Sequence, residues 1–529
     1  MRLFRDAIWH SLTARWRAFL VGAPALCLLS SIVLFTGAPA APGANAAEAM
    51  ASPPVLPGIC SESDRFGLAT TGGQVLEYNV ERFHAGWYVN FTLLQDAPHP
   101  ADMAYIQMIR LSDDDGDGTR ACLDCPTWDQ LLSAVQTNPG AIWLVGNEPD
   151  SQTIQQDNVT PGRYAELYRV FYDWLKQRDP ACLVGIGGVV QPTPIRLQYL
   201  GLILQAYAVQ NPDEPFMPID VWNVHNYVLR ERRFGLPDSW GAGVPPGIPD
   251  DEGIIYDLDE HTMLDPCDPL ENPDDPYCAD KIGWKRQLIE LRQFMADNGY
   301  QDRPLVISEY GTLMPAEYGY DWATVQAFML ATFAWLRTPF EEPIGYPADE
   351  NRLVQAWAWW PFDAKWTGSP PMELQAVLFD PDSHAPTSLG TRFGQYTGAL
   401  TDPYPGTVDL RVLSVLDRMP VLEPGGLVVT VTAEIANQGA VESGSFQVLF
   451  IVDGIEEPRI VAGSLLPGQV TSVHITKHVQ LGQTLQVSVA ADPDNLVIEC
   501  DPYNNQLTAE LWVGDHAVFL PISSRTSDP

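Results

Sequence analysis

Basic residues are scarce in this chain. Its 529 residues include 30 Lys and Arg against 67 Asp and Glu, which gives a net charge of −37 and a pI near 4.3. Such a surface repels phosphate backbones and anionic membranes, so nucleic acid is excluded as a partner. After the N-terminal leader, the sequence also lacks an apolar run long enough to span a bilayer. We therefore expect no membrane association beyond an N-terminal anchor.

Cysteines are also few, with eight in the whole chain. Cys122 and Cys125 form a C-x-x-C pair, but a second ligand pair is missing nearby, which argues against a zinc site. Cys267 and Cys278 flank a loop rich in Pro and Asp, and in an exported chain we expect both pairs to be oxidised. The sequence leaves open the pairing of the other cysteines after the leader, which are Cys60, Cys182 and Cys500.

The N-terminus has the order of a secretory signal peptide. Basic residues occur up to position 17, residues 18–35 are apolar, and residues 37–47 are mostly small. Ala44-Asn45-Ala46 offers a cleavage site, so we expect residues 1–46 to be a signal peptide and the protein to be secreted or at the bacterial cell surface. The alternative is an uncleaved anchor, because the apolar stretch just reaches the length of a membrane span.

Hydrophobic residues make up 46% of the chain, which is enough for a large packed core. From residue 60 to about 400, short apolar runs alternate with amphipathic stretches at helical spacing, as in βα units. The predicted strands are residues 65–70, 84–91, 104–111, 141–148, 182–190, 219–227, 304–311 and 354–362, and the clearest helices are residues 160–177, 281–298 and 322–337. This pattern predicts an α/β fold, a (β/α)8 TIM barrel, over residues 60–400.

The pattern changes after a turn-rich linker at residues 401–406. Alternating runs follow at residues 409–415, 427–436, 445–452 and 484–491, and turn signals such as Asp453-Gly454 separate them. Several short strands at this spacing predict an all-β immunoglobulin-like sandwich at residues 407–513, with a tail at residues 514–529.

Two predicted barrel strands end in a glutamate. Glu148 closes the fourth strand within Asn147-Glu148-Pro149, and Glu309 closes the seventh within Ser308-Glu309-Tyr310. Active sites of such barrels lie at the C-terminal ends of the strands, so both carboxylates are expected to face one cleft. Retaining glycoside hydrolysis needs a carboxylate pair of this kind: one protonates the leaving oxygen, and the other attacks the anomeric carbon. The alternative is that each is an ordinary polar strand end.

The two motifs, in these positions, resemble the clan A glycoside hydrolases, also called the 4/7 superfamily, over residues 60–400. The resemblance implies that Glu148 is the general acid/base and Glu309 the nucleophile, and that Asn147 binds the sugar 2-hydroxyl. It also implies that His225 and Tyr227, which end the sixth strand, contact the nucleophile or the sugar. The alternative for these two residues is core packing.

Aromatic residues at other strand ends are candidate sugar platforms. Trp359 and Trp360 close the eighth strand, where the clan often places a Trp beneath the sugar. Because side chains alternate along a strand, we expect one of them to line the cleft and the other to pack against helices. Trp87 on the second strand is a further candidate platform or, equally, a core residue.

An acidic segment follows the spacing of a calcium loop. Its candidate oxygen ligands are Asp113, Asp115, Asp117 and Asp124, where Asp124 replaces the usual Glu. This segment either binds a structural Ca²⁺ ion or is a solvated acidic loop. The expected reaction itself requires no cofactor. A second acidic stretch, residues 250–280, is expected to shape the cleft and argues against polyanionic substrates.

The C-terminal unit carries turn sequences such as Ala436-Asn437-Gln438-Gly439, and Glu499 precedes Asn504-Asn505. Their order resembles the Ig-like CARDB domain of bacterial adhesion-related proteins, which implies a spacer or binding module without chemistry. The tail resembles short C-terminal segments of some exported bacterial proteins.

These features predict a secreted retaining glycosidase that cleaves a polysaccharide or oligosaccharide with β-linkages, of the β-glucan type. One alternative is a catalytically inactive carbohydrate-binding or adhesion protein, although retention of both glutamates argues against it. Another is an exo-acting glycosidase of the same clan, for which a cleft blocked at one end by residues 250–280 would be the sign.

Overall fold

The structure is a computed structural model. It describes residues 56–514 except residues 71–74, 113–125, 153–155, 228, 230, 232–241, 250–282, 314–315, 317–319, 365–373, 419 and 502–503. The predicted leader, the aspartates of the calcium-loop pattern, the loop at residues 250–280 and most of the tail lie outside these residues. Among the described helices, none combines the length and the apolar character needed to cross a membrane.

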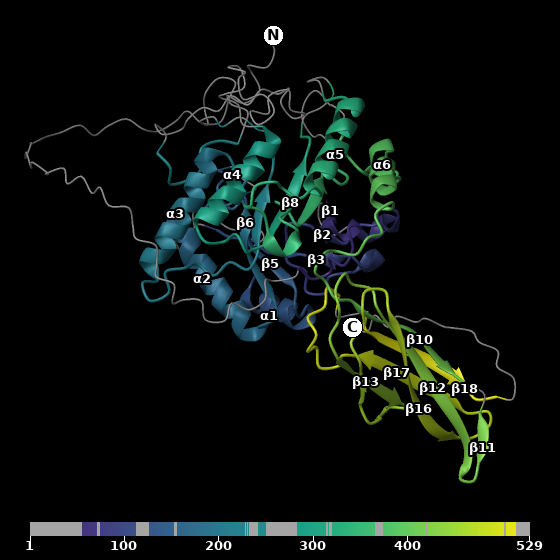
Figure 1. The fold of residues 1–529 in the computed structure, drawn as a ribbon. Helices are drawn as coiled ribbons and strands as arrows, with labels where there is room; N and C mark the ends of the chain where they lie inside the picture. Colours follow the sequence, from purple (N-terminus) through teal and green to yellow (C-terminus); the bar gives the residue numbers. More distant parts are fainter. Residues whose placement is uncertain are drawn as a thin grey trace, which may run out of the picture. The chain divides into compact units, whose positions relative to one another are not determined.

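Parallel strands form a closed barrel in the first part of the chain (Figure 1). The strands are β1 Phe66–Ala69, β2 Trp87–Val89, β3 Ala104–Tyr105, β4 Gln107–Ile109, β5 Ile142–Asn147, β6 Leu183–Gly188, β7 Trp222–His225, β8 Leu305–Gly311 and β9 Ala356–Trp360. The hydrogen-bonded orders are β3-β2-β1-β9-β8-β7 and β4-β5-β6. Bridges from Gly185 to Val221 and from Val189 to Val224 join β6 to β7. Because β3 and β4 are successive parts of one strand, eight positions close the ring, and the predicted (β/α)8 barrel is confirmed.

The helices cover the outside of the barrel, as Figure 1 shows for α3, α4 and α5. They are α1 Trp128–Thr137, α2 Pro161–Arg178, α3 Pro194–Gln210, α4 Trp284–Asp297, α5 Trp322–Leu336 and α6 Ser388–Thr397. Short 3-10 turns lie at Ser63–Arg65, Val75–Glu77, Val80–Phe83, Pro100–Asp102 and Pro347–Asp349. Local sequence fixes the helix starts: Pro161 and Pro194 occupy first turns, and Thr127 and Gln130 form a capping box at α1.

Strand alternation divides the barrel core into two layers. Inward residues such as Ala69, Leu144, Val306 and Ala356 fill the barrel, while a larger cluster packs the outer strand faces against the helices.

The C-terminal unit consists of two antiparallel sheets around a separate core. One sheet contains β10 Leu410–Asp417, β11 Val421–Glu423, β12 Gly426–Asn437 and β16 Val470–Val479. The other contains β13 Phe446–Val452, β14 Ile455–Glu456, β15 Ile460–Ala462, β17 Thr484–Ala491 and β18 Gln506–Trp512. Alternate residues of β12 and β17 point into the core, so the predicted sandwich is confirmed.

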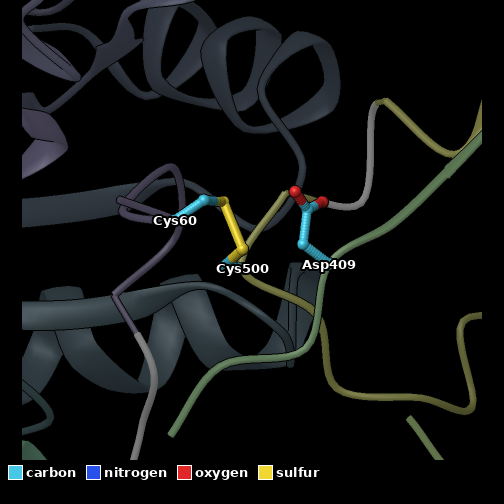
Figure 2. Close-up of side chains that lie close together, drawn as sticks. All are labelled: Cys60, Asp409 and Cys500. Atoms are coloured by element: carbon cyan, nitrogen blue, oxygen red, sulfur yellow. A yellow bond between two sulfur atoms is a disulfide. The ribbon is translucent and has the colours of Figure 1, made fainter. Parts of the chain in front are cut away.

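A disulfide links Cys60, just before the barrel, to Cys500 in the sandwich (Figure 2). The backbone N–H of Gly58 also donates to the Cys500 carbonyl at 2.8 Å. Asp409 lies beside the disulfide, but both sulfurs are bonded to each other and offer no thiolate to a metal ion. Cys182 is buried and free. Of the three cysteines whose pairing the sequence left open, the structure joins Cys60 to Cys500 and leaves Cys182 unpaired.

Candidate active site

Glu148 follows directly after β5, at the C-terminal end of the barrel. Its N–H donates to the Gly188 carbonyl at 2.9 Å, which ties it to the end of β6. Its φ of +42° lies in the left-handed region, which is unusual for a residue other than glycine. A strained conformation of this kind costs energy and persists only where the surrounding structure enforces it. Such conformations are found most often at functional sites.

Glu309 lies within β8 and reaches the same site from another side of the barrel. The register of β8 against β9 shifts between Ile307 and Tyr310, while His225 of β7 pairs directly with Glu309. Irregularities of this type re-aim a side chain relative to the strand. The Glu309 side chain is 13% exposed, so it is largely shielded but accessible from the strand ends.

His225 and Tyr227 connect the two glutamates. The imidazole Nδ1 of His225 lies 3.0 Å from Oε1 of Glu148 and 3.7 Å from Oε2 of Glu309. The hydroxyl of Tyr227 donates to Oε1 of Glu309. A carboxylate oxygen of Glu148 and one of Glu309 lie within 4.8 Å of each other. Two hydrogen-bonded pairs, His225 with Glu148 and Tyr227 with Glu309, therefore lie side by side at three strand ends.

Burial and mutual repulsion change the proton affinities in this group. Burial, together with the charge of Glu148, raises the pKa of Glu309 to about 7, against the opposing influence of His225 and Tyr227. Burial alone would lower the pKa of His225, but Glu309 and Glu148 raise it above its ordinary value. Burial therefore favours the protonated form of Glu309 up to about neutral pH.

Asn147 completes the polar surface around Glu148. Its N–H donates to Asp157 at 2.7 Å and its Nδ2 donates to Gln156 at 2.8 Å. Its Oδ1 has no hydrogen-bond partner among the described residues. This buried acceptor is available to a ligand hydroxyl.

The tryptophans predicted as sugar platforms occupy different places. Trp360 is partly exposed and packs on the inner side of the barrel, at the end of β9. Trp359 is fully buried, stacks edge-on against Tyr310, and donates its indole N–H to Ala376 at 2.8 Å. Trp359 is thus the one of the two tryptophans that packs between barrel and helices, as expected for one of them, and it is removed from the candidate sugar platforms.

Trp87 also lies away from the substrate cleft. It is 1% exposed, fills the barrel interior, and donates to the backbone carbonyl of Arg65 before β1. Gly67 makes room for it, since a Cβ there would lie 2.4 Å from the indole ring. Of the two alternatives for Trp87, the structure shows the core residue, because its ring has no face open to a ligand.

The sequence reasoning missed a buried ion network beside Glu148. Asp150, two residues after Glu148, pairs with Arg196 of α3, which also pairs with Glu231 at 2.9 Å. Arg196 further donates to the Ala242 and Gly243 carbonyls at 2.9 and 3.0 Å. Burial raises the pKa of Asp150 to about 6, although Arg196 opposes this. A signal was present in the sequence, because Arg196 is the one charged residue within α3.

Gly188 is a second residue that the sequence reasoning missed. Its carbonyl holds the Glu148 N–H, and its missing side chain leaves space for His225. A Cβ at this position would lie 2.7 Å from Cδ2 of His225. Gly188 therefore contacts both halves of the candidate acid/base arrangement.

Comparison with known proteins divides the chain in the same way as its fold. Residues 407–509 match the CARDB family. No curated protein matches the chain. A domain of a Methanosarcina acetivorans protein, provisionally described as a cell surface protein, is 32% identical and covers 21% of this chain and 95% of its own, with a TM-score of 0.19.

Solved structures that are similar over most of the chain are glycoside hydrolases. A glucosidase from Croceicoccus marinus is 12% identical, covers 80% of this chain and 94% of its own, and has a TM-score of 0.39. AbfB, a family 51 α-L-arabinofuranosidase from Bifidobacterium longum, is 9% identical, covers 82% of this chain and 98% of its own, and has a TM-score of 0.33. The chain thus joins a (β/α)8 barrel, with glutamates closing its fourth and seventh strands, to a C-terminal CARDB domain.

Proposed function

We propose that this protein is an exported retaining glycoside hydrolase that acts on β-linked glycans, with β-glucans as the favoured class. The observation that carries the proposal is the group of Glu148, His225 and Glu309, in which carboxylate oxygens from two strand ends lie within 4.8 Å. Retaining enzymes place their carboxyl groups about 5–5.5 Å apart, whereas inverting enzymes leave room for a water between them.

The reaction has two steps. The reaction starts from the form in which Glu309 is ionised and Glu148 holds a proton, and because the pKa of Glu309 is about 7, ionised Glu309 predominates only above neutral pH. First, ionised Glu309 attacks the anomeric carbon while Glu148 gives its proton to the leaving oxygen, and a glycosyl ester forms on Glu309. Glu148 then takes a proton from water, whose oxygen attacks the anomeric carbon and releases Glu309. Each carboxylate thereby returns to its starting protonation state.

The neighbouring residues fit these roles. Tyr227 binds Oε1 of Glu309 and leaves Oε2 for the attack, while His225 orients Glu148. The unpartnered Oδ1 of Asn147 can accept a hydrogen bond from a sugar hydroxyl, and Trp360 offers an aromatic surface. The provisional description of the Methanosarcina relative agrees with action outside the cell.

The test is release of reducing sugar from a panel of β-1,3-, β-1,4- and mixed-linked glucans, xylan, mannan and arabinan. We expect Glu148→Ala and Glu309→Ala to lose activity. Added azide should rescue them differently: a glycosyl azide of retained configuration from Glu148→Ala, and one of inverted configuration from Glu309→Ala. Retention of the wild-type protein on an insoluble glycan without any hydrolysis would contradict the proposal and favour a binding protein.

A further inference from the structure

The Glu148, His225 and Glu309 side chains also have the chemistry of a metal-binding group. We propose that they bind a divalent transition-metal ion of the Zn²⁺ type, and that this ion blocks the active site. The proposal goes beyond glycoside hydrolysis and rests on the geometry of the three side chains, whatever reaction the site performs.

The separations between the candidate ligand atoms are close to those found around a bound zinc ion. A tetrahedral zinc ion with bonds of about 2.0–2.1 Å holds its ligand atoms roughly 3.3 Å apart. Nδ1 of His225 lies 3.0 Å from Glu148 and 3.7 Å from Glu309, so these two separations lie on either side of that value. The two carboxylate oxygens lie within 4.8 Å, and rotation of either side chain would bring them closer.

The ligand types select a class of ion. Imidazole together with carboxylates suits Zn²⁺, Cu²⁺ or Ni²⁺, whereas Ca²⁺ and Mg²⁺ prefer oxygen ligands alone. Three protein ligands leave a fourth position for water, as in open zinc sites. The net charge of −37 adds a long-range attraction for cations.

Neighbouring residues orient Glu309 as a ligand, but they do not support His225 in the same way. Tyr227 occupies Oε1 of Glu309, so Oε2, the oxygen nearer His225, remains available. Coordination through Nδ1 of His225 moves the imidazole proton to Nε2, which is buried and has no hydrogen-bond partner among the described residues. We therefore expect weaker binding than in structural zinc sites, where both ring nitrogens are satisfied.

The experiment is a calorimetric Zn²⁺ titration of the oxidised full chain near neutral pH, in which the Cys60–Cys500 disulfide keeps those sulfurs from binding. The matched control is His384→Ala, because His384 lies 3.9 Å from Glu77 in another histidine–glutamate pair. We expect one ion per wild-type chain, unchanged affinity in His384→Ala, and a loss of at least about tenfold in His225→Ala and Glu309→Gln.

Several outcomes would overturn the proposal. They are absence of Zn²⁺ binding by the wild-type protein, wild-type affinity in His225→Ala, or an equal loss in His384→Ala. Thermal unfolding verifies that each variant is folded. If His225→Ala does not fold, the Zn²⁺ affinity of the isosteric Glu309→Gln variant tests the proposal in its place.

Inhibition provides a second readout. Where hydrolysis is measurable, Zn²⁺ should inhibit in competition with the glycan, and a chelator should restore the rate. Zn²⁺ binding without inhibition would contradict placement of the ion between the glutamates. The titration needs no substrate, so failure of the glycosidase proposal and failure of the metal proposal can be told apart.

Discussion

Both ends of the barrel contain buried carboxylates, but Glu62 and Asp349 at one end have arginine partners, whereas Glu148 and Glu309 at the other share one histidine. At the N-terminal end, Arg65 is fully buried and pairs with Glu62 at 2.9 Å and Asp349 at 2.6 Å. Asp349 also pairs with Arg352 at 3.0 Å, and Arg337 pairs with Glu62. Burial alone would lower the pKa of Arg65, but Asp349 and Glu62 raise it.

At the C-terminal end, two carboxylates face a single imidazole. The pKa of Glu309 rises to about 7, and buried polar atoms of Asn147 and His225 lack partners among the described residues. A balanced cluster serves stability, while an unbalanced cluster keeps groups available for proton transfer and ligand binding. This difference supports the proposed placement of the active site at the C-terminal end of the barrel.

The sharpest way to test this contrast is Glu309→Gln. We expect the rate of hydrolysis to fall by about 10³-fold or more, because the proposed nucleophile is lost. The free energy of unfolding of this variant should instead be higher than that of the wild type above neutral pH. The folded pKa of about 7 exceeds the ordinary 4.5, so folding favours the protonated form, and wild-type stability falls as pH rises through this window.

Gln cannot lose a proton, so the variant should gain up to about 3 kcal/mol over the wild type above pH 7 and nothing below about pH 4.5. Chemical unfolding at several pH values measures this difference. The control is Glu166→Gln, because the Glu166 side chain is exposed on α2. Its free energy of unfolding should change by no more than about 0.5 kcal/mol. A stability gain that is independent of pH would argue against the assigned titration.

Arg65→Met breaks the balanced end. It leaves Glu62 and Asp349 buried without their main cation, and we expect a loss of about 3–5 kcal/mol in the free energy of unfolding. The kcat of the folded protein should stay within about twofold, since Arg65 lies at the non-catalytic end. Denaturant unfolding and hydrolysis rates test both parts. A large activity loss with unchanged stability would reverse the comparison.

The disulfide between the two folded units should contribute to stability alone. The double change Cys60→Ser and Cys500→Ser removes a link between positions 440 residues apart. We expect a loss of about 2–4 kcal/mol, because the unfolded chain regains conformational freedom. Thermal unfolding with and without reductant measures it, and reductant should have no further effect on the double variant. Equal unfolding curves for wild type and variant would show that the link contributes nothing.

Gly188→Ala is a milder perturbation of the catalytic end. The new Cβ would lie 2.7 Å from Cδ2 of His225 and should displace the imidazole from Glu148. We expect kcat to fall by about 10–100-fold with little change in KM, as small misplacements of catalytic groups do. Gly162→Ala in α2 is the control, because its Cβ would meet nothing closer than 4.0 Å. Equal activity of the two variants would remove Gly188 from the site.

The sequence predicts the barrel and sandwich well because both follow local periodicity. All eight predicted barrel strands appear, and the polar residues that close apolar strands identify Glu148 and Glu309 as neighbours. Alternation also predicts that Trp359 and Trp360 face opposite sides. It cannot show which of them faces inward, because that depends on the register of β8 against β9.

Other features depend on contacts between distant segments. Trp87 fails as a sugar platform because Gly67 on a neighbouring strand opens a space for it inside the barrel. The pairing of Cys60 with Cys500, the network of Arg196 and the role of Gly188 all join residues far apart in the chain. A local pattern can mark one such residue, as the single charge in α3 marks Arg196, but it does not specify the distant partner.

The most direct measurement follows the anomeric configuration of the first product by proton NMR during hydrolysis of the best glycan of the panel. The short separation of Glu148 and Glu309 predicts retention, with the β-anomer appearing before mutarotation. Initial formation of the α-anomer would show inversion and would contradict a double displacement on Glu309.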